Sequence, residues 1–165
     1  GVRACTGFSK IPIMYKLISK IAERCHATAT KRGKDTSCVG CMDYLRVELA
    51  EYWKAVENDA NVPYFHETIS KATALPDAEF NALYAEKIHN TDVDELADIL
   101  IVAATWLHAA KLAGGEDFNP DKSIDVLLLC GALVFVAGQT KNAPEMEKLR
   151  TVVNLKMRYN ETRND

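Results

Sequence analysis

The stretch TDVDELADILIVAATWLHAAKLAGG, residues 91 to 115, decides the fold class. Thr91 can cap a helix, Asp94 stands at the third position of a variant capping box, and the pair Gly114-Gly115 ends the helix. Apolar residues at helical spacing recur along the chain, and alternating strand patterns are nearly absent. The sequence therefore predicts an all-α fold, a helical bundle of about five or six helices with a four-helix core.

Further helices are predicted on both sides of this stretch. Well-signalled helices cover residues 12–33, 42–58 and 124–137, a last one opens at Asn142 and Pro144, and weaker patterns cover 65–73 and 77–89. The segment 124–137 is apolar nearly all round but shorter than the roughly 20 residues of a bilayer span. We expect it to be a buried or subunit-interface helix of a single domain over residues 1–165, with residues 1–10 a candidate disordered extension.

The composition limits the class of protein. The chain is 48% hydrophobic and carries 20 Lys plus Arg against 23 Asp plus Glu, so its net charge of -3 gives no reason to expect a nucleic acid polymer or an anionic membrane as partner. The five cysteines are odd in number and scattered, which favours a reducing cytoplasm over a disulfide framework. Cys38 and Cys41 have metal or redox spacing, but no second pair accompanies them.

Two acidic motifs are the strongest functional signal. Glu-Leu-Ala-Glu at 48–51 and Glu-Leu-Ala-Asp at 95–98 each place two carboxylates three residues apart, on one face of a helix. Both adjoin residues typical of a core, so their helices are expected to pack with the motifs facing each other. Four facing carboxylates repel without a cation, and oxygen ligands favour Mg²⁺, with Mn²⁺ as an alternative. Glu48, Glu51, Glu95 and Asp98 are therefore predicted metal ligands.

The final helix carries a second pattern. Leu149 and Val153 are apolar, and the same face continues with Lys156, Asn160 and Arg163. A buried face that ends in these side chains can present hydrogen-bond donors to phosphate oxygens. We predict an anion-binding end of the helix there.

A competing metal site has a different ligand set. Glu23 with His26, and Glu86 with His89, both show the Glu-x-x-His spacing of di-iron helical bundles. A di-iron carboxylate protein is therefore an alternative, and a non-catalytic helical assembly protein is a further one.

Over residues 15 to 163 the chain resembles the MazG-like all-α nucleoside triphosphate pyrophosphohydrolases. Glu48, Glu51, Glu95 and Asp98 fill the family's E-x-x-E and E-x-x-D positions, and the run 94–101 is similar to the family's second motif. Residues at the end of the chain resemble its K-x-x-Y-N-x-x-R tail: Lys156, Tyr159, Asn160 and Arg163.

The resemblance implies a homodimer or homotetramer that hydrolyses NTP or dNTP, including noncanonical nucleotides as a housecleaning enzyme, to the nucleoside monophosphate and pyrophosphate. The acidic residues would hold Mg²⁺, which activates water, and Glu48 or Glu51 would act as the general base. Lys156, Asn160 and Arg163 would bind the substrate, with Tyr159 against the sugar or a neighbouring helix. A phosphoribosyl-ATP pyrophosphatase is a related alternative, because it is similar at the level of the bundle and of the acidic motifs. The long stretch between the two acidic motifs and the enlarged region 114–142 depart from the family's pattern and leave the base specificity open.

Overall fold

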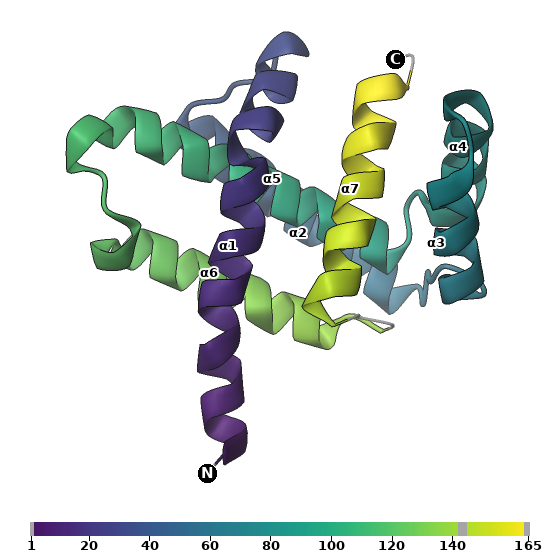
Figure 1. The fold of residues 1–165 in the computed structure, drawn as a ribbon, viewed down its shortest axis with the longest axis horizontal. Coiled ribbons are helices and arrows are strands. Elements are labelled where there is room, and N and C mark those ends of the chain that lie inside the picture. Colours follow the sequence, from purple (N-terminus) through teal and green to yellow (C-terminus); the bar gives the residue numbers. More distant parts are fainter. Residues whose placement is uncertain (1, 142–144, 164–165) are drawn as a thin grey trace. The chain divides into compact units, whose positions relative to one another are not determined.

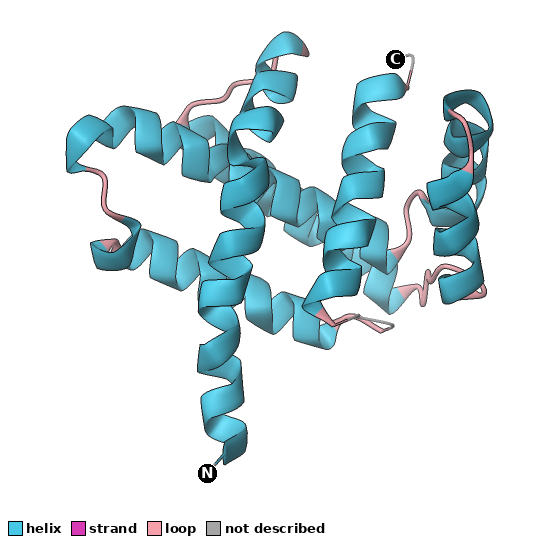
Figure 2. Cartoon of the chain, viewed as in Figure 1, coloured by secondary structure: helices cyan, strands magenta, loops and turns pink. Residues whose placement is uncertain are grey.

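The computed structural model describes residues 2–141 and 145–163, which are helical almost throughout (Figures 1 and 2). The helices are α1 (Val2–Lys31), α2 (Cys38–Glu57), α3 (Phe65–Ala74), α4 (Asp77–Leu83), α5 (Asp92–Gly114), α6 (Ile124–Gln139) and α7 (Met146–Thr162). A π-helical turn, Tyr84–Ile88, follows α4, and 3-10 turns at Gly115–Asp117 and Pro120–Lys122 lead to α6. These residues contain no strand. The all-α fold class is confirmed, with seven α-helices because both weakly patterned segments are helical.

The ends of α1 show what local sequence signals determine. The helix begins at Val2, before the start predicted near Pro12, and Pro12 lies inside it. Proline favours a first turn but is tolerated within a helix at a cost in stability. The C-terminus is as predicted: Gly33 has a φ of 74°, and the backbone N–H of Lys34 donates to the Ala29 carbonyl at 3.0 Å. Asn142 and Pro144, predicted to open the last helix, lie outside the described residues.

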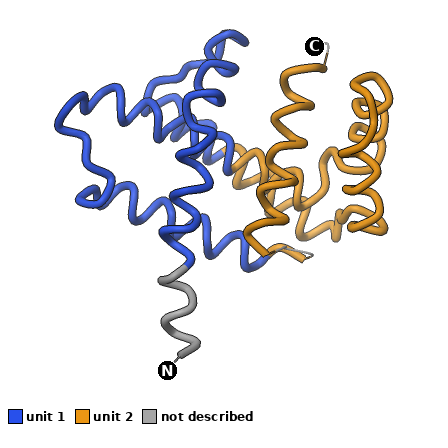
Figure 3. The backbone as a smooth tube through the Cα atoms, viewed as in Figure 1, with its two compact units in different colours: residues 1–46, 100–139 blue, residues 47–99, 140–165 orange. Residues whose placement is uncertain are grey.

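The chain divides into two compact units whose boundaries fall within α2 and α5 (Figure 3). Unit 1 comprises residues 1–46 and 100–139, and unit 2 comprises residues 47–99 and 140–165. All eight predicted site residues belong to unit 2. The expected single domain, its four-helix core and its N-terminal extension stay predictions.

In unit 1, α6 packs along α1 with one face only. Val126, Cys130, Leu133 and Val136 are buried on that face. Apolar residues elsewhere on the helix are exposed, among them Ile124, Leu128 and Phe135. The expectation of a fully buried helix is therefore wrong for this chain taken alone, and the subunit-interface alternative stays a prediction.

Within the described residues, one segment is long and apolar enough to cross a membrane, Asp92–Asp117, which includes α5. Its most apolar window is 56% buried within the chain, and a core helix of a soluble protein passes the same test of length and composition. The cytoplasmic location stays a prediction.

In unit 2, α7 packs against α3 and α4. Arg158 fastens α7 to the start of α4: its guanidinium donates to Asp77 at 2.8 and 3.0 Å and to the Leu75 carbonyl at 2.8 Å. The same guanidinium lies 4.1 Å from the centre of the Phe80 ring. These contacts fix the position of α7 along α4, and with it the anion-binding end predicted from the sequence.

Candidate functional site

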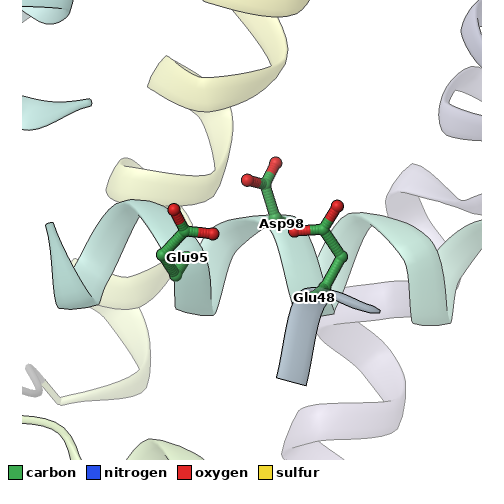
Figure 4. A group of neighbouring side chains, drawn as sticks. All are labelled: Glu48, Glu95 and Asp98. Carbon is green, nitrogen blue, oxygen red and sulfur yellow. The ribbon is translucent and has the colours of Figure 1, made fainter. Parts of the chain in front are cut away.

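Three carboxylates from two helices form an acidic cluster (Figure 4). Glu95 and Asp98 extend from the same part of α5, and the Glu48 side chain approaches them from α2. One oxygen of each lies within 4.8 Å of the others, and no other such group of three ligand residues occurs in the described part of the chain. Residues three apart share a helix face, which brings Glu95 and Asp98 together. The structure thus gathers three of the four predicted metal ligands.

Glu51 lies at the edge of this acidic cluster. It is exposed, one helical turn after Glu48 on α2, and its charge contributes to the raised pKa of Glu48. It does not belong to the group of three ligand residues. Glu51 therefore presents its carboxylate to solvent beside the cluster.

The electrostatics of the acidic cluster are unfavourable without a cation. Burial, followed by the charge of Asp98, raises the pKa of Glu48 and of Glu95 to about 8. Oε2 of Glu48 and Oε2 of Glu95 are buried and accept no hydrogen bond from the residues that the structure describes. A divalent cation would offset the repulsion and satisfy both oxygens. An all-oxygen set of this kind fits Mg²⁺ or Mn²⁺.

These raised pKa values predict how stability depends on pH. A carboxyl whose pKa rises from 4.5 to about 8 on folding binds more protons in the folded state, so its stabilising contribution is lost as pH increases between those values. Asp92, with a pKa of about 6, acts in the same direction over the lower part of this range. We expect the melting temperature of metal-free protein to fall from pH 5 to pH 8.

Mg²⁺ should reverse that fall, and raise the melting temperature more at pH 8 than at pH 5, because ligand carboxylates must be deprotonated to bind it. Thermal unfolding followed by circular dichroism, with chelator and with Mg²⁺, measures both trends. An increment from Mg²⁺ that is independent of pH would contradict the assignment of Glu48 and Glu95 as ligands.

Lys156 of α7 reaches the acidic cluster from inside the protein. Its side chain is 2% exposed, and Nζ lies 2.8 Å from Oδ1 of Asp94 and 3.5 Å from Oδ2 of Asp98. Burial would lower the pKa of Lys156, but the charges of Asp98 and Asp94 raise it instead. The ammonium is therefore positive and paired with carboxylates, whereas the sequence predicted it to face phosphate; a contact with substrate stays a prediction.

Asp94 is the residue of this region that the sequence analysis did not assign to the site. Its buried carboxylate accepts hydrogen bonds from the Tyr84 hydroxyl at 2.5 Å and from the Asn90 backbone N–H at 2.9 Å. Burial would raise the pKa of Asp94, but the neighbouring His89 imidazole and Lys156 outweigh it and lower the pKa to about 2. The capping-box position of Asp94 does not indicate this role, but its spacing of four residues from Asp98 favours the same helix face.

The π-helical turn before α5 positions the groups around Asp94. The backbone N–H of His89 donates to the Tyr84 carbonyl at 2.8 Å, five residues back. Asn90 then adopts a left-handed conformation with a φ of 65°. At the predicted cap, the Thr91 hydroxyl donates to the Ile88 carbonyl at 2.6 Å, tying the π turn to the start of α5.

The other predicted substrate-binding residues lie at the end of α7. Tyr159 stacks on Tyr84, with ring centres 4.4 Å apart, and is buried, which agrees with the packing role. The Arg163 guanidinium lies 5.2 Å from the centre of the Tyr159 ring. Oδ1 of Asn160 is buried and accepts no hydrogen bond from a described residue. An unsatisfied buried acceptor is costly, so Asn160 has an unused capacity to bind a donor.

No family model, curated protein or solved structure matches this chain. The MazG-like resemblance therefore rests on the sequence motifs and stays a prediction, while the all-α fold is shown by the helices themselves.

The residues of the di-iron alternative have other surroundings. His26 packs edge-on against His108, with ring centres 4.7 Å apart, and Glu23 and Glu86 are exposed. His89 Nδ1 is 3.5 Å from Oδ2 of Asp94. None of the four predicted di-iron ligands belongs to the acidic cluster.

The cysteine pair at the start of α2 is not a disulfide. Cys38 and Cys41 are both free, and burial raises the pKa of the Cys41 thiol to about 11. A thiol is nucleophilic or metal-binding as the thiolate, so this environment disfavours a redox or metal role for Cys41.

Proposed function

We propose that the protein is a Mg²⁺-dependent nucleoside triphosphate pyrophosphohydrolase, which converts an NTP or dNTP to the nucleoside monophosphate and pyrophosphate. The observation that carries this proposal is the acidic cluster of Glu48, Glu95 and Asp98, in which two buried oxygens lack hydrogen-bond partners among the described residues. Unit 2 also holds the predicted anion-binding end of α7, so the candidate cation-binding and anion-binding groups belong to the same compact unit. Their combination suits a metal-bound polyphosphate.

Glu48, Glu95 and Asp98 would hold the cation. Bound Mg²⁺ supplies charge neutralisation on the phosphates and a lower pKa for a coordinated water. The residues of the cluster fit this function because an ionised carboxylate accepts hydrogen bonds and donates none. Among the described residues, no donor reaches the two buried oxygens.

Glu51 is the better candidate for the general base. Glu48 lies within the group of three ligand residues, whereas Glu51 is exposed beside it and can accept the proton of the attacking water. Water attacks the α-phosphorus, the bond from that phosphorus to the α,β-bridging oxygen breaks, and pyrophosphate leaves. The carboxylate then returns the proton to solvent.

Asn160 and Arg163 would bind the substrate. A guanidinium can donate two parallel hydrogen bonds to phosphate oxygens, which suits Arg163 to the leaving pyrophosphate. The Asn160 amide oxygen accepts hydrogen bonds, so it fits a sugar hydroxyl or a base N–H. Tyr159 lies between Tyr84 and Arg163, and it would support this end of α7 without contacting the nucleobase of the substrate.

A substrate screen tests the reaction class. Ribo- and deoxyribonucleoside triphosphates, the corresponding diphosphates and phosphoribosyl-ATP are incubated with Mg²⁺, and pyrophosphate and phosphate are measured separately. We expect pyrophosphate from triphosphates or from phosphoribosyl-ATP, and no activity in chelator. Release of phosphate alone, or of neither product, would contradict the proposal.

Arg163→Ala should weaken triphosphate binding and leave cation binding intact. Loss of a charge-assisted hydrogen bond of about 1.5–3 kcal/mol corresponds to an increase in KM of about tenfold or more. Steady-state kinetics and a Mg²⁺ titration separate the two properties. Arg158→Ala is the matched control, because that guanidinium pairs with Asp77 and should affect the melting temperature more than KM. Equal losses of substrate and Mg²⁺ binding in Arg163→Ala would indicate a structural role.

A further inference from the structure

Asp94 is held in place by its own segment of chain. The Tyr84 hydroxyl donates to Oδ1 at 2.5 Å, and the Asn90 N–H donates to Oδ2 at 2.9 Å. Both donors precede α5 and neither belongs to α7. The Asp94 carboxylate therefore has a fixed position that does not depend on Lys156.

Lys156 lies between two carboxylates that differ in surroundings. Its Nζ is 2.8 Å from Asp94, whose side chain is 0% exposed, and 3.5 Å from Asp98, whose side chain is 21% exposed. The shorter contact is within hydrogen-bond distance and the longer one is not an ideal hydrogen bond. The ammonium thus lies within ion-pair distance of both carboxylates, and its shorter contact is with the buried Asp94.

We propose that Asp94 is a positioning residue: it holds the Lys156 ammonium back from Asp98 and so keeps the Asp98 carboxylate accessible to a divalent cation. This inference rests on the proposed function, whose metal site contains Asp98. Asp94 touches neither cation nor nucleotide and acts through Lys156.

The physical reason is competition between two cations for one carboxylate. With Asp94 ionised, the Lys156–Asp94 pair is neutral as a whole, so Lys156 offsets only part of the negative charge of Asp98. Without the Asp94 charge, the buried ammonium must find another anion, because an unpaired buried charge is strongly disfavoured. Asp98 is 3.5 Å away, so Lys156 would bind it and occupy the place of the divalent cation.

The test is a titration of metal-free protein with Mg²⁺, followed by isothermal calorimetry without nucleotide. Asp94→Asn preserves the shape of the side chain; its one amide oxygen can still accept from the Asn90 N–H, and its NH2 can donate to the Tyr84 hydroxyl oxygen. It should raise the dissociation constant about 10- to 100-fold, as for other residues that orient a metal ligand. Asp92→Asn is the matched control: it removes a buried aspartate from the same turn of α5, whose carboxylate accepts from the Val93 N–H. Its Mg²⁺ affinity should stay close to that of wild type.

The double variant Asp94→Asn with Lys156→Met tests whether Asp94 affects Mg²⁺ binding through Lys156. It removes the competing ammonium, so Mg²⁺ affinity should return toward the wild-type value, a rescue that general damage to the fold would not produce. Tyr84→Phe, which keeps both charges but removes one hydrogen bond to Asp94, should weaken Mg²⁺ binding in the same direction by a smaller factor. It provides the test if Asp94→Asn does not fold.

The outcomes separate this inference from the proposed function. If wild type binds Mg²⁺ and Asp94→Asn binds it equally well, the role of Asp94 is overturned while the metal site stands. If the double variant is as weak as Asp94→Asn, the route through Lys156 is overturned. If wild type binds neither Mg²⁺ nor Mn²⁺, the metal site and the inference fail together.

Discussion

Glu95→Gln should abolish Mg²⁺-dependent release of pyrophosphate. The expected loss in kcat/KM is about 10³-fold or more, at least as large as the loss in rate when an enzyme loses one hydrogen-bond donor to its transition state. An amide of the same size cannot supply the negative charge that the cation needs. The fold should persist, because burial already raises the pKa of Glu95 to about 8 and glutamine mimics its protonated form. Metal-free Glu95→Gln should even melt at a higher temperature than wild type at pH 8. A coupled pyrophosphate assay and circular dichroism provide the two measurements.

Glu86→Gln is the matched control for this variant. Glu86 also belongs to unit 2 but is exposed and lies 3.5 Å from the Lys87 ammonium. Turnover should therefore stay at the wild-type level. Because Glu86 is a predicted di-iron ligand, a loss of activity in Glu86→Gln together with full activity in Glu95→Gln would favour the di-iron alternative and reject the magnesium site.

Lys156→Met should lower the free energy of unfolding by about 3–5 kcal/mol, the usual cost of removing one partner from a buried ion pair. Methionine fills a similar volume, but the fully buried Asp94 carboxylate then lacks the cation 2.8 Å away. Chemical denaturation at pH 7 measures the change. Lys148→Met, an exposed position on the same helix, should change stability by no more than about 0.5 kcal/mol.

The free energy of unfolding of the double variant Asp94→Asn with Lys156→Met identifies the cause of the stability loss in Lys156→Met. Removing both charges leaves no unpaired ion, so most of the loss should be recovered. If Lys156→Met is as stable as wild type, Lys156 is not needed to balance Asp94. If the double variant is as unstable as Lys156→Met, the loss comes from packing of the lysine stem.

Local patterns in the sequence predicted most of the helices. Gly33, for example, favours a left-handed backbone conformation, and α1 ends two residues before it, at Lys31. The start of α1 could not be predicted in this way, because Pro12 is compatible with both a first turn and a helix interior. The segment before α5 was predicted as one helix to residue 89, whereas α4 ends at Leu83 and a π turn follows.

The candidate site was predicted in part for a similar reason. The spacing of Glu95 and Asp98 is sufficient to predict that they share a helix face. The position of Glu48 beside them depends on the packing of two helices that are far apart in sequence, α2 and α5, within unit 2. The role of Asp94 depends on Tyr84 and Lys156, which are far from the motif in sequence or carry no spacing signal. Likewise the partner of His26 is His108 on another helix, which no Glu-x-x-His spacing could indicate.

Because of the π turn at Tyr84–Ile88, the hydrogen bond from Tyr84 to Asp94 depends more on the number of residues between them than on the identity of those residues. Each residue advances an α-helix by about 100°, so one residue more or fewer before Asn90 would rotate the Tyr84 hydroxyl away from Asp94. The π turn closes an i→i+5 hydrogen bond, from the His89 N–H to the Tyr84 carbonyl, so it contains one residue more than an α-helical turn. Insertions and deletions should thus be excluded between Tyr84 and Asp94, even where substitutions at its exposed positions, such as Ala85 and Lys87, are tolerated.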